Sequence, residues 1–434
     1  MSYIQVDARG CGVGKTRTTI IPRIKQNIQD GIRTLVVVPS KTLQGEYFAH
    51  FESDEITVVN SDSGRVYEQY QTALTPVVCI THQGFLQTPH ELFEKMNWDL
   101  IIDEALDPYA SITFKTHDSA GRVWIGFDQI TAWAQPEYVP STKPQCNPQP
   151  YFELEFTQST APDIIDRQLW QKLSNPNYRK WSTWEIGENL MNNRAETCTI
   201  QFELDTRIFS DWTSVWIAGA AFDRTFMGYW LEGKYEIAHK FEPHHAPAHW
   251  HIPQEEFSWS KNFKAKNPHV EHAFRSYIDT HRNGRVIYNS NNDSTTIMPF
   301  GSRINHNAHG VNQYSHLTDY AFMSAIKPHP QFRNFIRERC GLDNTQLEFA
   351  FAGYTAYQLL MRSALRDPNN TTVVNLFFLD TQQSLSIMDL FDPTTYEVSH
   401  IETIQGNKTK PLTQAQRHKR WRLKQQQQKA SKKG

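Results

Sequence analysis

The residues best suited to chemistry lie close to the start of the chain. A short apolar stretch leads into the loop GCGVGKT, whose three glycines can adopt backbone angles closed to other residues. Consecutive N–H groups can then turn inward around a phosphate, while Lys15 supplies a positive charge and Thr16 a hydroxyl for Mg²⁺. We therefore predict a phosphate-binding loop. The residues expected to surround the phosphates are Gly10, Cys11, Gly12, Val13, Gly14, Lys15 and Thr16.

This loop fits the general pattern G-x-x-x-x-G-K-[ST] with one departure. The position five residues before Gly14 is Arg9, whereas the pattern has glycine there. A chance GKT on a loop is the alternative interpretation, and the motifs further along the chain argue against it. We interpret Cys11 as a small packing residue in preference to an oxidation-sensitive thiol.

A pair of carboxylates follows a second apolar stretch. Trp98–Asp103 reads as a strand, and Glu104 comes directly after it. Asp103 can hold Mg²⁺ through water, and Glu104 can orient or activate the attacking water for phosphoryl transfer. A helix N-terminus whose dipole favours carboxylates would contain the same residues. The phosphate-binding loop about 90 residues upstream favours the catalytic interpretation.

Two arginines near residue 360 have helical spacing. Gln358, Arg362 and Arg366 are four residues apart, so on a helix they would share one face. Both guanidinium groups could then point across a cleft toward phosphates. An arginine that reaches a γ-phosphate from an opposite domain is worth about 10³ to 10⁵ in rate. A solvated helical face is the alternative.

Alternating strands and helices must position the first two motifs. Apolar, β-branched runs over 34–39, 56–60, 77–81 and 98–103 alternate with helical stretches. This order predicts a parallel, doubly wound sheet whose site lies at the carboxyl ends of the strands. Lys15 and Asp103 would both lie on that edge.

Four segments in this region resemble a known family. RGCGVGKT, VVVPSKTLQ, VCITHQGFL and LIIDEA follow in the order and spacing of motifs I, Ia, Ic and II of superfamily 2 helicases, where motif II is the DEAD/DEAH-type box. The resemblance implies a first RecA-like domain and ATP-driven movement along, or unwinding of, a nucleic acid. It also implies that the nucleic-acid backbone is contacted by Ser40, Lys41, Thr42, Thr81 and His82.

The second half of the chain resembles the remaining helicase motifs. The stretch 215–221 resembles motif III, although Gly219, Ala220 and Ala221 stand where the family has Ser/Thr-Ala-Thr. After a helix-like stretch at 270–282, the stretch 285–289 resembles motif IV. Motif V is matched by 307–312, and motif VI by 358–366 with a strand at 373–379 after it. The resemblance implies that Arg362 and Arg366 close on the nucleotide from a second RecA-like domain, with Gln358 beside it.

These segments divide the chain into six parts. The stretch 108–200 contains five prolines between 136 and 150 and one possible helix at 162–173, so we predict an accessory insertion there. Four histidines between 244 and 251 are interpreted as part of a solvated linker in preference to a metal site. The predicted parts are the first part of RecA-like domain 1 at 1–107, the insertion at 108–200, the completion of domain 1 at 201–240, the linker at 241–269, RecA-like domain 2 at 270–405 and a basic disordered tail at 406–434.

The charge of the chain is distributed unevenly. The 434 residues carry a formal net charge of -2, but residues 408–434 contain ten Lys and Arg and no Asp or Glu. We predict that this tail neutralises nucleic-acid phosphates. Trp421 could stack on a base, and a solubilising tail is the alternative. The tail residues assigned to nucleic acid are Lys419, Arg420, Trp421 and Arg422.

Composition bounds the location of the protein. No apolar run approaches the roughly 20 residues that span a bilayer, and the first residues form a phosphate loop instead of a signal peptide. The five cysteines lie far apart, so neither a disulfide framework nor a zinc ribbon is indicated. We expect a cytoplasmic protein, located in the host cytoplasm if it is encoded by a phage or mobile element.

We therefore expect an α/β protein with two RecA-like parallel-sheet domains, an accessory insertion and a basic tail. The expected function is an ATP- and Mg²⁺-dependent helicase or translocase that acts on DNA in preference to RNA, with replication or recombination proteins as partners. No segment resembling a Q motif precedes the loop, so the sequence does not support adenine selectivity. The alternatives are a nucleic-acid-binding protein that has lost turnover, and a P-loop kinase acting on a small molecule.

Overall fold

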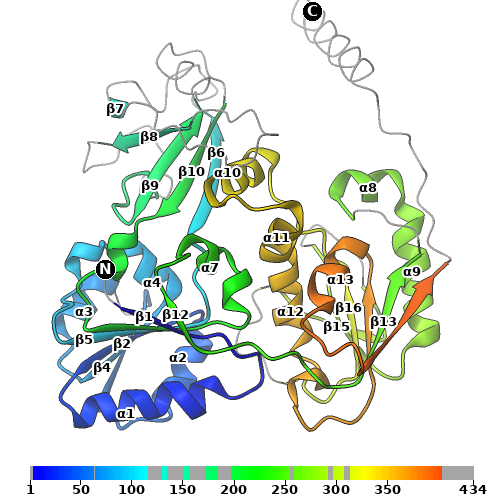
Figure 1. Ribbon diagram of the computed structural model, residues 1–434, viewed down its shortest axis with the longest axis horizontal. Coiled ribbons are helices and arrows are strands. Elements are labelled where there is room, and N and C mark those ends of the chain that lie inside the picture. Colours follow the sequence, from blue (N-terminus) through cyan, green and yellow to red (C-terminus); the bar gives the residue numbers. More distant parts are fainter. Residues whose placement is uncertain are drawn as a thin grey trace, which may run out of the picture.

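Three β-sheets organise the protein. The computed structural model describes residues 3–62, 64–115, 130–133, 151–156, 172–183, 197–254, 259–291, 297–306 and 313–402. Within these residues a seven-stranded parallel sheet forms a first lobe and a six-stranded parallel sheet forms a second lobe. The two lobes lie side by side, and a five-stranded antiparallel sheet extends from the first lobe (Figure 1).

The strands of the first lobe come from two separate parts of the chain. They are β1 (Ile4–Asp7), β2 (Arg33–Val38), β3 (Ile56–Val59), β4 (Val77–Thr81), β5 (Trp98–Asp103), β11 (Ser214–Ala218) and β12 (Glu236–His239). Their order is β12-β1-β11-β5-β2-β4-β3, so β1 and β5 flank β11 near the centre. The predicted strands at 34–39, 56–60, 77–81 and 98–103 are confirmed as β2 to β5. The stretch resembling motif III begins with β11.

Helices cover both faces of this sheet, which explains the continuous apolar runs. Leu35 and Val37 pack into the core on one face of the sheet, whereas Val36 and Val38 pack into the core on the other face. The covering helices and turns are η1 (Thr16–Ile20), α1 (Ile21–Gln29), α2 (Lys41–Phe48), α3 (Val66–Thr72), α4 (His82–Gln87), η2 (His90–Leu92), η4 (Thr206–Phe209), η5 (Phe222–Arg224) and α7 (Phe226–Trp230).

A proline shapes the helix that follows the phosphate loop. The first turn, η1, is π-helical, and the Ile21 N–H bonds to the Thr16 carbonyl five residues back. Pro22 follows as the second residue of α1, where it lacks an N–H and its ring would clash with the carbonyl of Thr18. The wider π-helical turn accommodates this ring without ending the helix.

The predicted insertion contains a regular antiparallel sheet. Its strands are β6 (Tyr109–Lys115), β7 (Ile130–Trp133), β8 (Tyr151–Phe156), β9 (Tyr178–Thr183) and β10 (Thr197–Leu204), in the order β6-β10-β9-β8-β7. Because β10 pairs with β6 and ends at Leu204, the insertion runs slightly past the predicted boundary at residue 200. The proline-rich stretch and most of the helix expected at 162–173 lie outside the described residues.

The second lobe repeats the parallel architecture. Its strands are β13 (Ala248–Pro253), β14 (Val286–Asn289), β15 (Gly301–Arg303), β16 (Asp319–Phe322), β17 (Val374–Phe378) and β18 (Tyr396–Ile401), in the order β15-β14-β16-β17-β13-β18. The helices and turns are α8 (Lys261–Lys266), α9 (Pro268–His281), α10 (Pro330–Cys340), α11 (Asn344–Glu348), η6 (Phe349–Gly353), α12 (Tyr354–Leu360), η7 (Ala364–Arg366) and α13 (Thr381–Met388). The helix expected at 270–282 is α9, and the strands expected at 285–289 and 373–379 are β14 and β17.

The linker expected at 241–269 needs correction. Residues 248–253 form β13, which lies between β17 and β18 in the second sheet. The solvated interpretation is therefore wrong for His251, which is 3% exposed and stacks on Phe377 at a centroid distance of 4.5 Å. This strand was not predicted because histidines and a proline interrupt its apolar residues, although its Trp250 is fully buried. Among the described residues, no group of three or more His, Cys, Asp or Glu could hold a metal ion.

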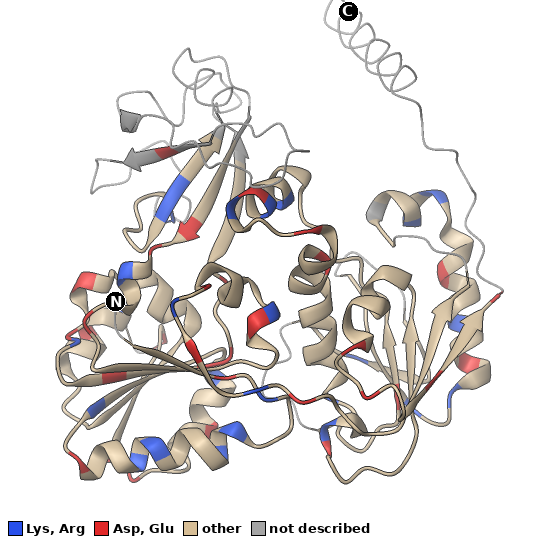
Figure 2. Ribbon diagram, viewed as in Figure 1, with Lys and Arg blue, Asp and Glu red and all other residues tan. Residues whose placement is uncertain are grey.

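Charged residues lie mainly on helices and loops, and few lie on the strands of the two parallel sheets (Figure 2). Over the part of the chain that the structure describes, none of the helices has the length and apolar character needed to cross a bilayer. The stretch 307–312 that resembles motif V and the basic tail, including Lys419, Arg420, Trp421 and Arg422, lie outside the described residues.

Candidate functional site

The phosphate loop joins β1 to η1 at the carboxyl edge of the first sheet, and Arg9 fixes its start. The Arg9 guanidinium donates to Asp7 Oδ1 from Nε at 2.9 Å and to Thr19 Oγ1 from Nη2 at 2.6 Å. Although burial by itself raises the pKa of Asp7, the Arg9 guanidinium holds that pKa below its ordinary value. Arg9 therefore ties the loop to the strand before it and the helix after it. Arg9 thus has a structural role at the position where the general pattern has glycine.

Two glycines give the loop its shape. Gly12 and Gly14 have φ angles of 86° and 75°, in the left-handed region that side chains disfavour. The Lys15 ammonium reaches back across the loop and donates to the carbonyl oxygens of Arg9 at 2.7 Å and Gly10 at 3.0 Å. The loop thus holds a positive charge beside its own backbone, where an anionic ligand would be stabilised.

Asp103 lies at the end of β5 opposite the loop. Its Oδ2 accepts hydrogen bonds from Tyr47 Oη at 2.9 Å and from Thr16 Oγ1 at 3.3 Å. Burial and the neighbouring carboxylate of Glu104 raise the pKa of Asp103 to about 6. A hydroxyl beside a buried carboxylate matches the oxygen ligands that Mg²⁺ prefers, so Thr16 and Asp103 fit a divalent cation held together with phosphates.

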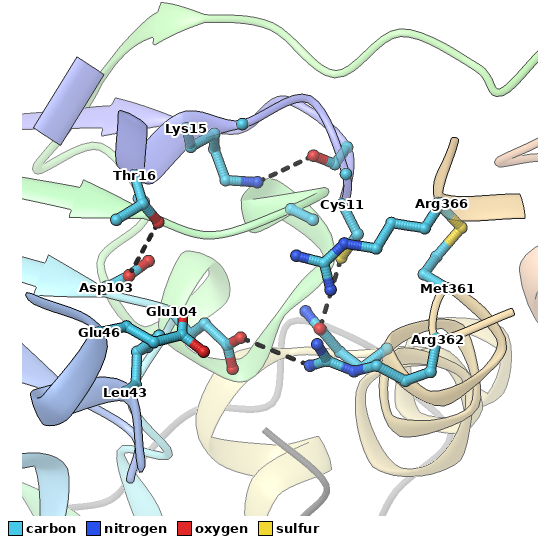
Figure 3. Close-up of a pocket in the computed structure, with 16 residues that line it drawn as sticks. Cys11, Lys15, Thr16, Leu43, Glu46, Asp103, Glu104, Met361, Arg362 and Arg366 are labelled. Atoms are coloured by element: carbon cyan, nitrogen blue, oxygen red, sulfur yellow. Dashed lines mark hydrogen bonds and ion pairs between the residues drawn. The ribbon is translucent and has the colours of Figure 1, made fainter. Parts of the chain in front are cut away.

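Glu104 has a strained backbone. Its φ is 70°, and its N–H donates to the carbonyl of Ala218 in the adjacent strand at 2.7 Å. A non-glycine residue in this conformation costs about 1–3 kcal/mol and is found most often at functional sites. The turn directs the carboxylate toward the second lobe, where Oε1 lies 4.0 Å from Nη2 of Arg362 (Figure 3).

The second lobe supplies Gln358, Arg362 and Arg366, although not from one helical face as predicted. That prediction is wrong because α12 ends at Leu360, Ser363 is extended, and Arg366 lies in the short turn η7. The side chains converge nonetheless on the phosphate loop (Figure 3). Arg362 is 7% exposed, and its Nε is buried without a hydrogen-bond partner in the described structure.

These groups enclose a cavity of about 120 Å³ between the lobes, which we call the phosphate cavity. The structure brings together there every residue predicted for phosphate, metal or catalysis except Val13; their roles remain predictions. Leu43, Glu46 and Met361 were not anticipated. The lining residues are Gly10, Cys11, Gly12, Gly14, Lys15, Thr16, Leu43, Glu46, Asp103, Glu104, Ala218, Ala220, Gln358, Met361, Arg362 and Arg366.

The two lobes also contact each other directly at the loop. The Cys11 N–H donates to Tyr357 Oη at 2.9 Å, and that hydroxyl lies 2.6 Å from Nε2 of His244. Burial, together with the charge of Lys15, lowers the pKa of His244 to about 4, so the imidazole is neutral near pH 7. Burial raises the pKa of the Cys11 thiol, which agrees with a packing residue. Nothing in the local sequence marks His244 or Tyr357, since their partner is distant in the chain.

The lack of room around the loop is a second reason why these positions are glycines. A Cβ on Gly10 would lie 2.9 Å from the His244 ring, and a Cβ on Gly12 would clash with the Arg366 carbonyl oxygen. Contacts of this length are excluded for real side chains. The glycines therefore serve the approach of the second lobe as well as the turn.

The residues expected to contact nucleic acid lie at the same sheet edge, but several have local partners. Ser40 Oγ accepts from the Leu43 N–H and caps α2, and Thr81 Oγ1 caps α4 by accepting from the Gly84 N–H. The remaining three are placed as follows: Lys41 forms an exposed ion pair with Asp62, Thr42 is exposed on α2, and His82 Nε2 lies 2.9 Å from the Asp103 carbonyl oxygen.

Comparison with known proteins agrees with this geometry. Residues 3–120 match the model of the flavivirus DEAD domain, a stretch that contains the phosphate loop, Asp103 and Glu104. No curated protein sequence matches the chain. Nothing in these comparisons bears on the phage or mobile-element origin, which remains a prediction.

One solved structure supports the overall fold. The structure of S. tokodaii Xpd4 aligns with a TM-score of 0.50 and 9% identity over 92% of this chain and 96% of that chain. Structures named XPD_APO and XPD_Helicase align with TM-scores of 0.49, identities of 10% and 9%, and coverage of 92% of this chain and 97% and 96% of theirs. The expected fold class, α/β with two RecA-like parallel-sheet domains, is confirmed.

Proposed function

We propose that this protein is an ATP- and Mg²⁺-dependent nucleic-acid helicase or translocase that acts on DNA in preference to RNA. The observation that carries the proposal is the convergence of Lys15, Asp103 and Glu104 from the first lobe with Arg362 and Arg366 from the second on one cavity. The DEAD-domain match over residues 3–120 supports the same assignment. We propose replication or recombination as its setting.

Each group in the cavity has a distinct chemical role in phosphoryl transfer. The loop N–H groups and Lys15 would bind the β- and γ-phosphates. Thr16 and Asp103 would hold Mg²⁺, which would supply positive charge to offset that of the phosphates. Glu104 accepts a proton from, and orients, the attacking water. Arg362, which lines the cavity opposite Lys15, would stabilise the charge that develops on the γ-phosphate.

The contacts between the lobes supply the coupling to movement. Because Tyr357 and Arg366 touch the phosphate loop directly, binding and release of a triphosphate change the contacts that hold the lobes together. A nucleic-acid strand held across both lobes would then advance as the lobes close and open. We propose the stretches 40–42 and 81–82, with the basic tail at 406–434, as its contacts.

One observation favours a second function. Gly219, Ala220 and Ala221 lack the hydroxyls that the resemblance leads us to expect after β11, and such hydroxyls can link hydrolysis to movement. A nucleic-acid-binding protein that binds nucleotide and turns it over slowly or not at all would tolerate their loss. This alternative keeps the fold and the cavity but removes the motor activity.

ATP hydrolysis, measured separately with single-stranded DNA, duplex DNA and RNA, tests the proposal. We expect stimulation by nucleic acid, strongest with DNA, and its loss in Lys15→Ala and Glu104→Gln. Lys25→Ala, on the exposed face of α1, is the matched control and should retain it.

A wild-type protein with no stimulated hydrolysis would contradict the proposal. Nucleic-acid binding without even single-turnover hydrolysis would then support the second function. Transfer of phosphate to a metabolite without nucleic acid would support a P-loop kinase instead.

A further inference from the structure

A segment that begins beside the phosphate cavity ends in contact with the second lobe. Strand β11 of the first lobe finishes at Ala218, whose carbonyl accepts the Glu104 N–H at 2.7 Å. Ala218 and Ala220 both line the phosphate cavity. A short distance further along the chain, Arg224 reaches side chains and backbone of the second lobe. We call residues 219–224 the bridging segment.

The bridging segment is fixed to the first lobe by its backbone. The Gly219 N–H donates to the Asp7 carbonyl oxygen at 3.0 Å, where β1 ends and the phosphate loop begins. The Ala221 N–H donates to the Ala8 carbonyl oxygen, also at 3.0 Å. Ala221 has a φ of 46°, a left-handed conformation that residues other than glycine seldom adopt, so the chain turns sharply there. The start of the segment therefore has a defined position relative to the loop.

The small side chains of the bridging segment pack on the second lobe. Ala220 and Ala221 are buried and belong to a hydrophobic cluster whose other buried members all lie between residues 246 and 391, Phe349 among them. The segment thus meets the second lobe through methyl groups, at positions where the family resemblance leads us to expect hydroxyls. Apolar packing can hold two surfaces together but gives little directional control.

Arg224 adds three directional contacts with the second lobe. Nη1 donates to Asp389 Oδ1 at 2.9 Å, Nη2 donates to the Ser386 carbonyl oxygen at 3.1 Å, and the central guanidinium carbon lies 3.9 Å from the centroid of the Phe349 ring. The Arg224 side chain is 25% exposed. A partly exposed ion pair contributes little by itself, but a planar guanidinium that also stacks on a ring and bonds to a carbonyl has a fixed orientation.

The contacts of Arg224 lead back to the phosphate cavity. Phe349 begins η6, which continues directly into α12, and Arg362 follows the end of that helix. Arg362 in turn lies 4.0 Å from Glu104 inside the cavity (Figure 3). The helical stretch 349–360 is therefore held near the first lobe at both ends, by Arg224 outside the cavity and by Arg362 inside it. Because a helix is a rigid element, the position of one end constrains the position of the other.

We propose that Arg224 is a positioning residue: by holding η6 and α12 against the first lobe, it keeps Arg362 aligned with Glu104. This inference rests on the proposed hydrolysis of a nucleoside triphosphate and names a residue outside the cavity on which that hydrolysis depends. Arg224 is not among the described residues that line the phosphate cavity. Its loss should therefore lower kcat and leave KM for ATP nearly unchanged.

Steady-state hydrolysis by Arg224→Gln is the first test. We expect kcat to fall at least tenfold and KM for ATP to change less than twofold. Arg282→Gln is the matched control, because Arg282 also donates to a carboxylate (Asp279) and a carbonyl oxygen (Gly284) and lies over a ring (Phe300), but entirely within the second lobe. It should keep kcat within twofold of the wild type. A kcat that falls equally in both variants, or in neither, would overturn the proposal.

Combining the substitution with Arg362→Gln tests whether Arg224 acts through Arg362. If Arg224 only positions Arg362, adding Arg224→Gln to Arg362→Gln should lower the single-turnover rate less than twofold further. Losses that multiply in the double variant would show that the two arginines act independently, and would overturn the proposal.

Hydrogen exchange tests the contact between the lobes without hydrolysis. The Cys11 N–H donates to Tyr357 across the lobes, so its exchange rate reports how firmly the second lobe is held on the loop. In the nucleotide-free protein, Arg224→Gln should raise exchange of the peptide containing Cys11 at least fivefold, and Arg282→Gln should leave it unchanged. Equal exchange in Arg224→Gln and wild type would overturn the proposal whether or not ATP is hydrolysed. Faster exchange in a protein that hydrolyses no ATP would support the role of Arg224 in holding the lobes and contradict the proposed function alone.

Discussion

The Tyr47 hydroxyl opposes the rise that burial and Glu104 cause in the pKa of Asp103, and removing it should shift the pH dependence of hydrolysis. Tyr47 is fully buried on α2, and its hydroxyl donates to Asp103 Oδ2 at 2.9 Å. This hydrogen bond favours the ionised carboxylate and opposes the effect of burial, which raises the pKa of Asp103 to about 6. Tyr47→Phe keeps the ring and removes only the donor.

The size of the shift follows from the hydrogen bond. A hydrogen bond to a charged group contributes about 1.5–3 kcal/mol, and one pKa unit corresponds to about 1.4 kcal/mol. The pKa of Asp103 should therefore rise by about one to two units in Tyr47→Phe. Since the ionised form is needed to hold Mg²⁺, activity at limiting Mg²⁺ should fall off near pH 6 in the wild type and near pH 7 to 8 in the variant.

The assay is ATP hydrolysis against pH at limiting and at saturating Mg²⁺. Saturating Mg²⁺ should move the acid limb to lower pH in both proteins, because the metal competes with the proton. Tyr320→Phe is the control: its buried hydroxyl donates to Asn289 at 3.2 Å in the core of the second lobe. An acid limb at the same pH in Tyr47→Phe and wild type, at limiting Mg²⁺, would refute the reasoning.

Three further perturbations have defined outcomes. Folding raises the pKa of Asp103 from 3.8 to about 6, so ionisation of this carboxyl costs stability as the pH rises from about 4 to about 6. Asp103→Asn should therefore raise the free energy of unfolding, measured by urea denaturation, by about 3 kcal/mol at pH 8 and by little at pH 3.5. An equal gain at both pH values would contradict this. Gly12→Ala should weaken ATP binding and lower stability more than Gly31→Ala does. Both glycines have positive φ, but only Gly12 faces a neighbouring carbonyl oxygen. Equal losses of ATP affinity and of unfolding temperature in the two variants, measured by calorimetry, would show that the contact between the lobes is unimportant. Deleting residues 408–434 should weaken DNA binding and flatten its dependence on salt while unstimulated hydrolysis is retained, and an unchanged salt slope would exclude the tail as a contact.

The sequence by itself determined the parts of the site that depend on local chemistry. The glycines of the phosphate loop, Lys15 and the carboxylates after β5 are recognisable because their spacing fixes the turn and the strand end that hold them. Strands β2, β4, β5 and β11 of the first lobe were equally predictable, since burial on both faces requires an uninterrupted apolar run, whereas the mostly exposed edge strand β12 has no such run and was not predicted.

Only the tertiary structure decided which distant side chains complete the site. Tyr47 meets Asp103 because α2 packs against the sheet beside β5, and His244 and Tyr357 reach the loop because the second lobe docks there. Arg362 and Arg366 converge although their helix ends at Leu360, so packing between the lobes fixes their direction where helical periodicity does not. These contacts join residues tens to hundreds of positions apart, and no local pattern encodes them because the free energy that forms them comes from burying two surfaces against each other.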